Sequence, residues 1–206
     1  MKFQIRDETD KALVISLQHE FMRCDDAFNE LVHWTTKFFP DTNPRRASYR
    51  AYNSYARFVH HLYEFMMGAI NRDRRDTTSI RADEADRLLT REFQKIITRR
   101  RAAILEGRAP AWENDISAYP EDVSPSVATE FRRLRNTIIG HAKHERASLS
   151  LSDFFQRNHM YLYLLYEDTK WLWLPKKGEF PDLGEITAFS LAVQHSPSIQ
   201  TSTHSQ

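Results

Sequence analysis

Apolar residues recur at three- and four-residue spacing over long stretches of the chain, which is the periodicity of an amphipathic helix. The first stretch covers residues 7–39 and carries Leu13, Leu17, Phe21 and Phe28 at this spacing. Similar patterns predict further helices over residues 44–71 and 81–106 and from residues 125 and 152 onward. No stretch alternates as a strand does, and 5 glycines in 206 residues leave little room for tight turns. We expect an all-α protein, an antiparallel up-and-down bundle of four to five long helices.

Prolines mark the expected boundaries of these helices. Pro40 and Pro44 end the first pattern, because proline disfavours helix in the residue before it. The segment 107–125 carries three prolines and predicts a long loop, after which Ser124 and Pro125 suit the N-cap and first turn of a helix. Ser152 and Asp153 are expected to begin the fifth helix. We therefore predict one helical domain over residues 1–175 and a C-terminal extension over 176–206 with a disordered tail.

The same periodicity predicts which side chains are buried. The expected core residues of the last four helices are Tyr52, Tyr55, Val59, Leu62, Met66, Ala85, Leu88, Leu89, Phe93, Ile96, Ile97, Val127, Phe131, Leu134, Ile138, Phe154, Phe155, Tyr161, Leu162, Leu165 and Trp171 or Leu172. The only cysteine, Cys24, lies on the apolar stripe of the first helix. We expect it to be a buried residue without a chemical role, in a protein of a reducing compartment.

No segment has the properties of a membrane anchor or a signal peptide. The most hydrophobic stretch, residues 161–174, is short and is interrupted by Glu167, Asp168 and Lys170. Charged residues at the N-terminus do not fit a cleavable signal. We expect a cytoplasmic protein without a membrane partner.

Charge is unevenly distributed along the chain. The net charge is +1, but residues 45–101 hold 14 Lys and Arg against 7 Asp and Glu. This asymmetry is compatible with a basic face that attracts polyanions. It is equally compatible with solvated helix faces whose cations pair with acidic segments elsewhere.

Several common chemistries lack their motifs. HExxH and paired Glu-x-x-His motifs are absent, and one cysteine excludes a zinc cluster built on thiolates. The spacing of His141 with His144, and of His61 with Glu64, is a weak metal signal, because either pair offers only two ligands. Neither GxGxxG, GxxxxGK[ST] nor GxSxG occurs. We expect neither a metal ion nor a cofactor.

The segment 132–146, RRLRNTIIGHAKHER, contains a more specific constellation. In a continuous helix Arg135 and His141 would lie roughly 9 Å apart along the axis and about 120° apart around it. Gly140 permits a bend that could bring His141 toward Arg135, with Asn136 able to orient the imidazole or a phosphate.

These residue types suit the cleavage of RNA without a metal ion. A histidine can take the proton of a 2′-hydroxyl or give one to the departing 5′-oxygen. An arginine stabilises the negative charge that develops at phosphorus. One histidine does not easily do both tasks in one turnover, whereas a two-fold dimer that joins two copies of the segment supplies two.

Arg135, Asn136 and His141 resemble the R-x4–6-H motif of HEPN-domain ribonucleases, in which a polar residue commonly follows the arginine. The resemblance covers roughly residues 7–174 in helix pattern and about seven residues in motif. It implies a HEPN-like fold and a metal-independent endoribonuclease that acts as a homodimer, as a toxin of a toxin–antitoxin pair or a phage-defence effector. It implies catalytic roles for Arg135 and His141 and a supporting role for Asn136.

The sequence departs from one branch of that family. Toxins of this family that are controlled by AMP transfer carry a tyrosine two residues after the histidine, where this chain has Lys143. A protein antitoxin is therefore the more plausible partner. Lys143, His144 and Arg146 either contact phosphate beyond the site or are cations favoured by the end of a helix.

Two alternatives stay open at this stage. Glu64 on the second helix is either an acidic partner of Arg135 that contributes to the substrate site or an ordinary carboxylate near Arg57 or His61. Arg135 and His141 are either catalytic or an internally paired arginine and a capping histidine. In the second case the chain is a non-catalytic HEPN-like helical module that binds RNA or serves as a protein adaptor.

Overall fold

The computed structural model describes residues 1–36, 44–138, 149–175 and 184–194. The chain divides into two compact units, Met1–Leu174 and Pro175–Gln206. The helices of the first unit are α1 (Glu8–Thr36), α2 (Pro44–Arg74), α3 (Ala82–Leu105), α4 (Pro125–Ile138) and α5 (Leu151–Trp173), with the short 3-10 turns η1 (Ala111–Glu113) and η2 (Ile116–Ala118) before α4. The second unit holds α6 (Glu185–Gln194). The predicted all-α class is confirmed, since the parts of the chain described here contain helices and no strand.

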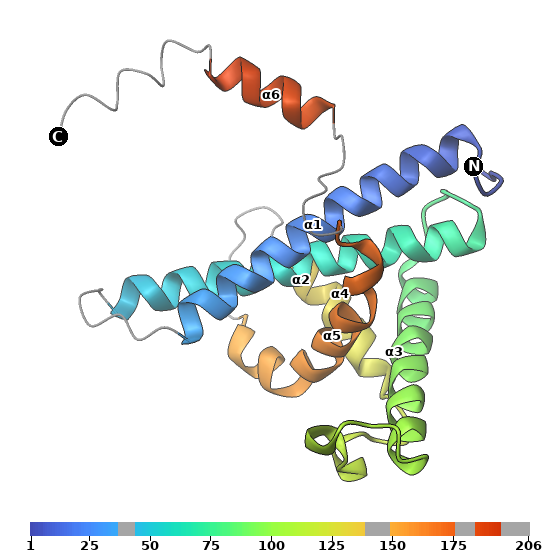
Figure 1. Cartoon of the computed structure of the whole chain (residues 1–206), viewed down its shortest axis with the longest axis vertical. Helices are drawn as coiled ribbons and strands as arrows, with labels where there is room; N and C mark the ends of the chain where they lie inside the picture. The colour runs from blue at the N-terminus through green and yellow to red at the C-terminus, as the bar shows by residue number, and fades with distance from the viewer. Residues whose placement is uncertain (37–43, 139–148, 176–183, 195–206) are drawn as a thin grey trace. The chain divides into compact units, whose positions relative to one another are not determined.

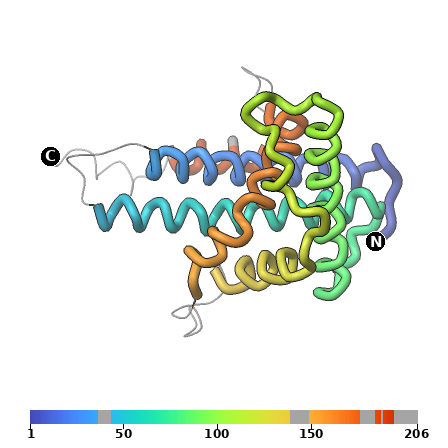
Figure 2. Tube along the Cα trace, turned by 90° about the horizontal axis from the view of Figure 1, so that it is seen from below, coloured from blue at the N-terminus to red at the C-terminus, as the bar shows by residue number. Residues whose placement is uncertain are grey.

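Helices α1 and α2 form a long antiparallel pair (Figures 1 and 2). Asp7 caps α1, because its Oδ1 accepts the backbone N–H of Asp10 at 2.9 Å. Pro44 is the first residue of α2, a position where its missing N–H costs nothing. Helix α3 crosses this pair steeply (Figure 1). Helix α4 packs against α2 and α3, and α5 packs against α1, α2 and α3.

A single aromatic-rich core joins the five helices of the first unit. Phe21 on α1 packs edge-to-face on Phe65 of α2 with ring centroids 4.8 Å apart. Phe131 on α4 does the same with Tyr63 of α2 at 5.2 Å. Pairs in this geometry contribute beyond the area that they bury. The contact between Phe131 and Tyr63 packs α4 against α2 one helical turn before Arg135.

The expected helix boundaries that fall on described residues hold to within three residues, and the largest difference is the end of α2, which lies at Arg74 where Asn71 was expected. Helix α4 begins at Pro125 as predicted, whereas α5 begins at Leu151 instead of Ser152. The reason is that Ser150 caps α5, with its Oγ accepting the N–H of Asp153 at 3.1 Å. The expected end of the first helix, at Phe39, lies outside the described residues.

Most residues expected in the core are buried, including Cys24 and every predicted position of α3 and α4. Three expectations were wrong, since Tyr52 and Phe155 are exposed and so are both Trp171 and Leu172, one of which was expected in the core. At the end of α5 the inward position belongs to Trp173, whose ring lies 5.3 Å from that of Phe65. Residues one and two positions away on a helix point in other directions, so Trp171 and Leu172 cannot share it.

Candidate functional site

Arg135 lies in the last described turn of α4 and is held by three groups. Its Nη2 forms an ion pair with Oε1 of Glu64 on α2, and its Nη1 donates a hydrogen bond of 2.9 Å to Oδ1 of Asn136. Its Cζ lies 5.5 Å from the centre of the Tyr63 ring, within range of a cation–π contact. The side chain is nevertheless 33% exposed. The guanidinium is therefore oriented by the protein without being sealed from solvent.

The Arg135–Glu64 pair decides between the two interpretations of Glu64. The alternative partners of this carboxylate are engaged elsewhere, since Arg57 pairs with Glu30 and His61 contacts Glu20. Glu64 is thus the acidic partner of Arg135 across the bundle, and its description as a carboxylate beside Arg57 or His61 was wrong. Its predicted contact with substrate stays a prediction.

A pocket of about 360 Å³ opens beside this pair between α1, α2 and α4. Its polar lining consists of Ser16, Glu20, Arg23, His60, Glu64 and Arg135, and its apolar lining includes Leu13 and Leu17. Gly68 also lines the pocket, and a Cβ there would meet Cδ2 of Leu17 at 2.7 Å, so glycine allows α1 and α2 their close approach. The pocket combines two carboxylates, two guanidinium groups and an imidazole.

Two adjacent histidines of α2 face Glu20 of α1 at one side of the pocket. Nδ1 of His61 lies 2.6 Å from Oε1 of Glu20, and the His60 and His61 rings lie 5.0 Å apart. Burial is the largest single influence on the pKa of Glu20 and raises it, but the hydrogen bond with His61 and the charges of His61, Arg23 and His60 together outweigh burial, so the net pKa is lowered. Burial, and then the neighbouring His61, lower the pKa of His60, which favours the neutral form of its ring.

Sequence reasoning missed the contribution of Glu20 and His60 to this pocket. The dipeptide His60-His61 is visible in the sequence, and the spacing of His61 and Glu64 drew attention to this turn of α2. Glu20, however, lies 41 residues before His61. Its place opposite the histidines depends on the register of α1 against α2, which helical periodicity does not determine.

The remaining residues predicted for the site are His141, Lys143, His144 and Arg146, and they lie outside the described residues. Of the predicted set, the structure brings together Arg135, Asn136 and Glu64. Ile138, three residues before His141, is the last described residue of α4.

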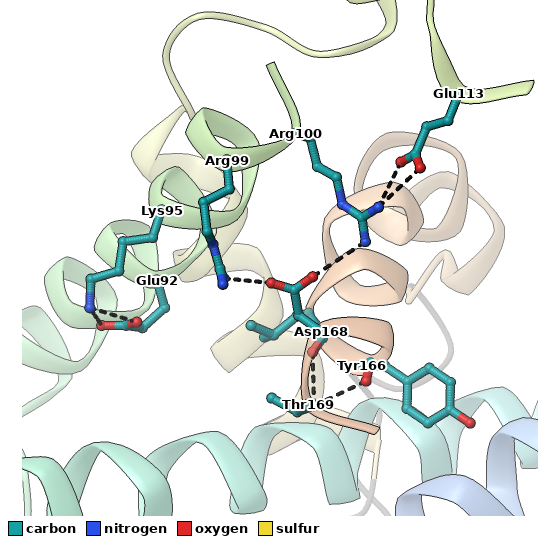
Figure 3. A network of polar contacts seen from close by, with 9 residues as sticks. Glu92, Lys95, Arg99, Arg100, Glu113, Tyr166, Asp168 and Thr169 are labelled. Carbon is teal, nitrogen blue, oxygen red and sulfur yellow. Dashed lines mark hydrogen bonds and ion pairs between the residues drawn. The ribbon is translucent and has the colours of Figure 1, made fainter. Parts of the chain in front are cut away.

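Arg99, Arg100 and Arg101 form a basic run near the end of α3. Their side chains bind other parts of the same fold, as Figure 3 shows for Arg99 and Arg100. Arg99 and Arg100 both form ion pairs with Asp168 of α5, and Arg100 also binds Glu113 of η1 at 3.0 Å. Arg101 donates a hydrogen bond of 2.6 Å to the backbone oxygen of Tyr119. These cations hold two elements on α3, the loop that precedes α4 and the helix α5. In this part of the basic segment the cations therefore pair with acidic groups elsewhere in the chain, which was one of the two interpretations of the uneven charge.

None of the helices that the structure describes combines the length and the apolar character needed to cross a bilayer. Comparisons with protein-family models, with characterised proteins and with solved structures found no match to this chain.

Proposed function

We propose that this protein is a metal-independent endoribonuclease that acts as a toxin of a toxin–antitoxin pair or as a phage-defence effector. The observation that supports this proposal best is the state of Arg135, which is oriented by Glu64 and Tyr63 and is partly exposed at the edge of a pocket. A fixed, charged, forked donor at a concave surface suits the charge that develops on a phosphodiester in the transition state.

In this proposal Arg135 stabilises the pentacoordinate phosphorus and His141 transfers protons, with Asn136 as a supporting group. The 2′-oxygen of the ribose attacks phosphorus, its proton goes to a base, and the 5′-oxygen leaves with a proton from an acid. The products are a 2′,3′-cyclic phosphate and a 5′-hydroxyl end. A homodimer joins two copies of the site, and a protein antitoxin in the cytoplasm restrains it.

Incubation of the purified full chain with RNA in excess EDTA tests this proposal. We expect cleavage that chelation does not reduce, fragments that end in a cyclic phosphate, and a His141→Ala variant that is folded and inactive. Loss of cleavage in EDTA, or a His141→Ala variant as active as the wild type, would contradict the proposal.

A second candidate function has its own supporting observation. The ion pair with Glu64 gives Arg135 a structural task that requires no chemistry, as expected of a helical RNA-binding or adaptor module. Expression of the wild type and of His141→Ala side by side in cells separates the two. Growth arrest that the substitution relieves supports the ribonuclease, and equal growth of both strains supports the module.

A further inference from the structure

Glu20, His60 and His61 gather three metal-binding groups from two helices at one side of the pocket. One ligand atom from each residue lies within 4.8 Å of those of the other two. In a tetrahedral zinc site with bonds of about 2.1 Å, ligand atoms are about 3.4 Å apart. The 2.6 Å between Nδ1 of His61 and Oε1 of Glu20 is shorter than this spacing, and the 4.8 Å limit is longer, so shifts of about 1 Å would bring the three atoms to ligand spacing.

The chemistry of the donors fits a transition metal. Two imidazoles and one carboxylate form the His2Glu set that holds catalytic zinc in several hydrolases, with a water molecule in the fourth position. His60 has a buried Nδ1 that makes no hydrogen bond to any described residue. A buried acceptor without a partner carries an energetic cost that coordination would remove.

The surroundings leave one side of the cluster open. Glu20 and His60 both line the pocket, so a fourth position on the ion would face that space. Two guanidinium groups lie near the cluster, and carboxylates offset their charges. Arg135 is paired with Glu64, and Nη1 of Arg23 lies 3.8 Å from Oε2 of Glu20.

We propose that Glu20, His60 and His61 bind a divalent transition-metal ion such as Zn²⁺, with the fourth position open to water or a ligand in the pocket. The ion would also tie α1 to α2, since its ligands come from both helices. This proposal does not rest on the ribonuclease activity, which needs no metal.

Direct metal binding by the full chain tests the proposal. The protein is stripped with EDTA, the chelator is removed, and Zn²⁺ is titrated by calorimetry at neutral pH. We expect one ion per chain, and at least tenfold weaker binding in each of Glu20→Gln, His60→Ala and His61→Ala. His33→Ala, on the same helix as Glu20 and outside the cluster, is the matched control and should bind as the wild type does.

Two further measurements keep the outcome clear. A variant that carries both His141→Ala and His144→Ala should retain full affinity, which separates this site from the proposed ribonuclease residues. Co²⁺ added to the wild type should give the intense visible bands of a four- or five-coordinate ion, a readout that needs no substitution. The absence of stoichiometric Zn²⁺ binding, or equal weakening in His33→Ala and His61→Ala, would overturn the proposal.

Discussion

The Arg135 guanidinium on α4 forms an ion pair with the Glu64 carboxylate on α2, although the two residues lie far apart in the sequence. Both side chains retain about a third of their exposure, 33% for Arg135 and 34% for Glu64. The pair therefore fixes a cation at the edge of the pocket and also links two helices. These two roles can be separated by experiment.

The structural role predicts a measurable coupling between the two residues. We expect a double-mutant cycle of Glu64→Gln and Arg135→Gln to give an interaction free energy of about 1 kcal/mol, because the pair is only partly shielded from water. Urea unfolding of the four proteins measures it. A coupling of zero within error would mean that the pair contributes nothing to stability.

The ion pairs of Asp168 predict that its substitution lowers the free energy of unfolding more than substitution of the neighbouring Glu167 does. Asp168→Asn removes the charged partner of both Arg99 and Arg100, so we expect the free energy of unfolding to fall by about 1–2 kcal/mol. Glu167→Gln is the matched control, since among the described residues the one ion pair of Glu167 is a partly exposed contact of 3.8 Å with Lys170. We expect this substitution to cost less than about 0.5 kcal/mol. Equal unfolding curves for the two variants would show that the ion pairs of Asp168 drawn in Figure 3 do not stabilise the fold.

His159 predicts a dependence of stability on pH. Burial lowers the pKa of His159 from 6.5 to about 4, and its ring stacks on Phe155 at 4.3 Å. Below pH 6.5 the unfolded chain binds a proton that the folded chain does not, so the free energy of unfolding falls as the pH drops toward 4. The loss from this residue amounts to at most about 3 kcal/mol.

Urea unfolding of the wild type and of His159→Phe at several pH values tests this dependence. Phenylalanine keeps the stacking, so the variant should be folded and should lose less stability on acidification. The other acid-sensitive groups are present in both proteins and cancel in the difference. Parallel losses in the two proteins would show that His159 does not titrate as expected.

The fold was predictable where local periodicity decides the outcome. Phe93 and Phe131 could be placed in the core because their helices bury one continuous face. The position of Trp171 could not be predicted, because α5 carries apolar residues on several of its faces. Packing against Phe65 is what places Trp173 against the core instead. Hydrophobicity predicts that a face is buried, but not which of two aromatic residues two positions apart lies on it.

The candidate site shows the same division. Arg135 and Asn136 could be predicted because they are adjacent in one motif, and the structure places them in contact. Glu64 could be named as a possible acidic partner of Arg135, but the sequence did not exclude an ordinary carboxylate near Arg57 or His61. Glu20 and His60 escaped prediction because their meeting depends on how α1 and α2 pack, which no short-range pattern in the sequence encodes.

The most direct test of the central claim compares RNA cleavage by Arg135→Lys with that by Arg133→Lys. Both substitutions keep a positive charge on α4. Arg135→Lys removes the forked guanidinium at the pocket, whereas Arg133 does not line this pocket. We expect kcat to fall about 10²-fold in Arg135→Lys. Arg133→Lys should cleave as the wild type does. Equal activity of all three proteins, or no cleavage by the wild type, would contradict the assignment of Arg135 as the catalytic cation.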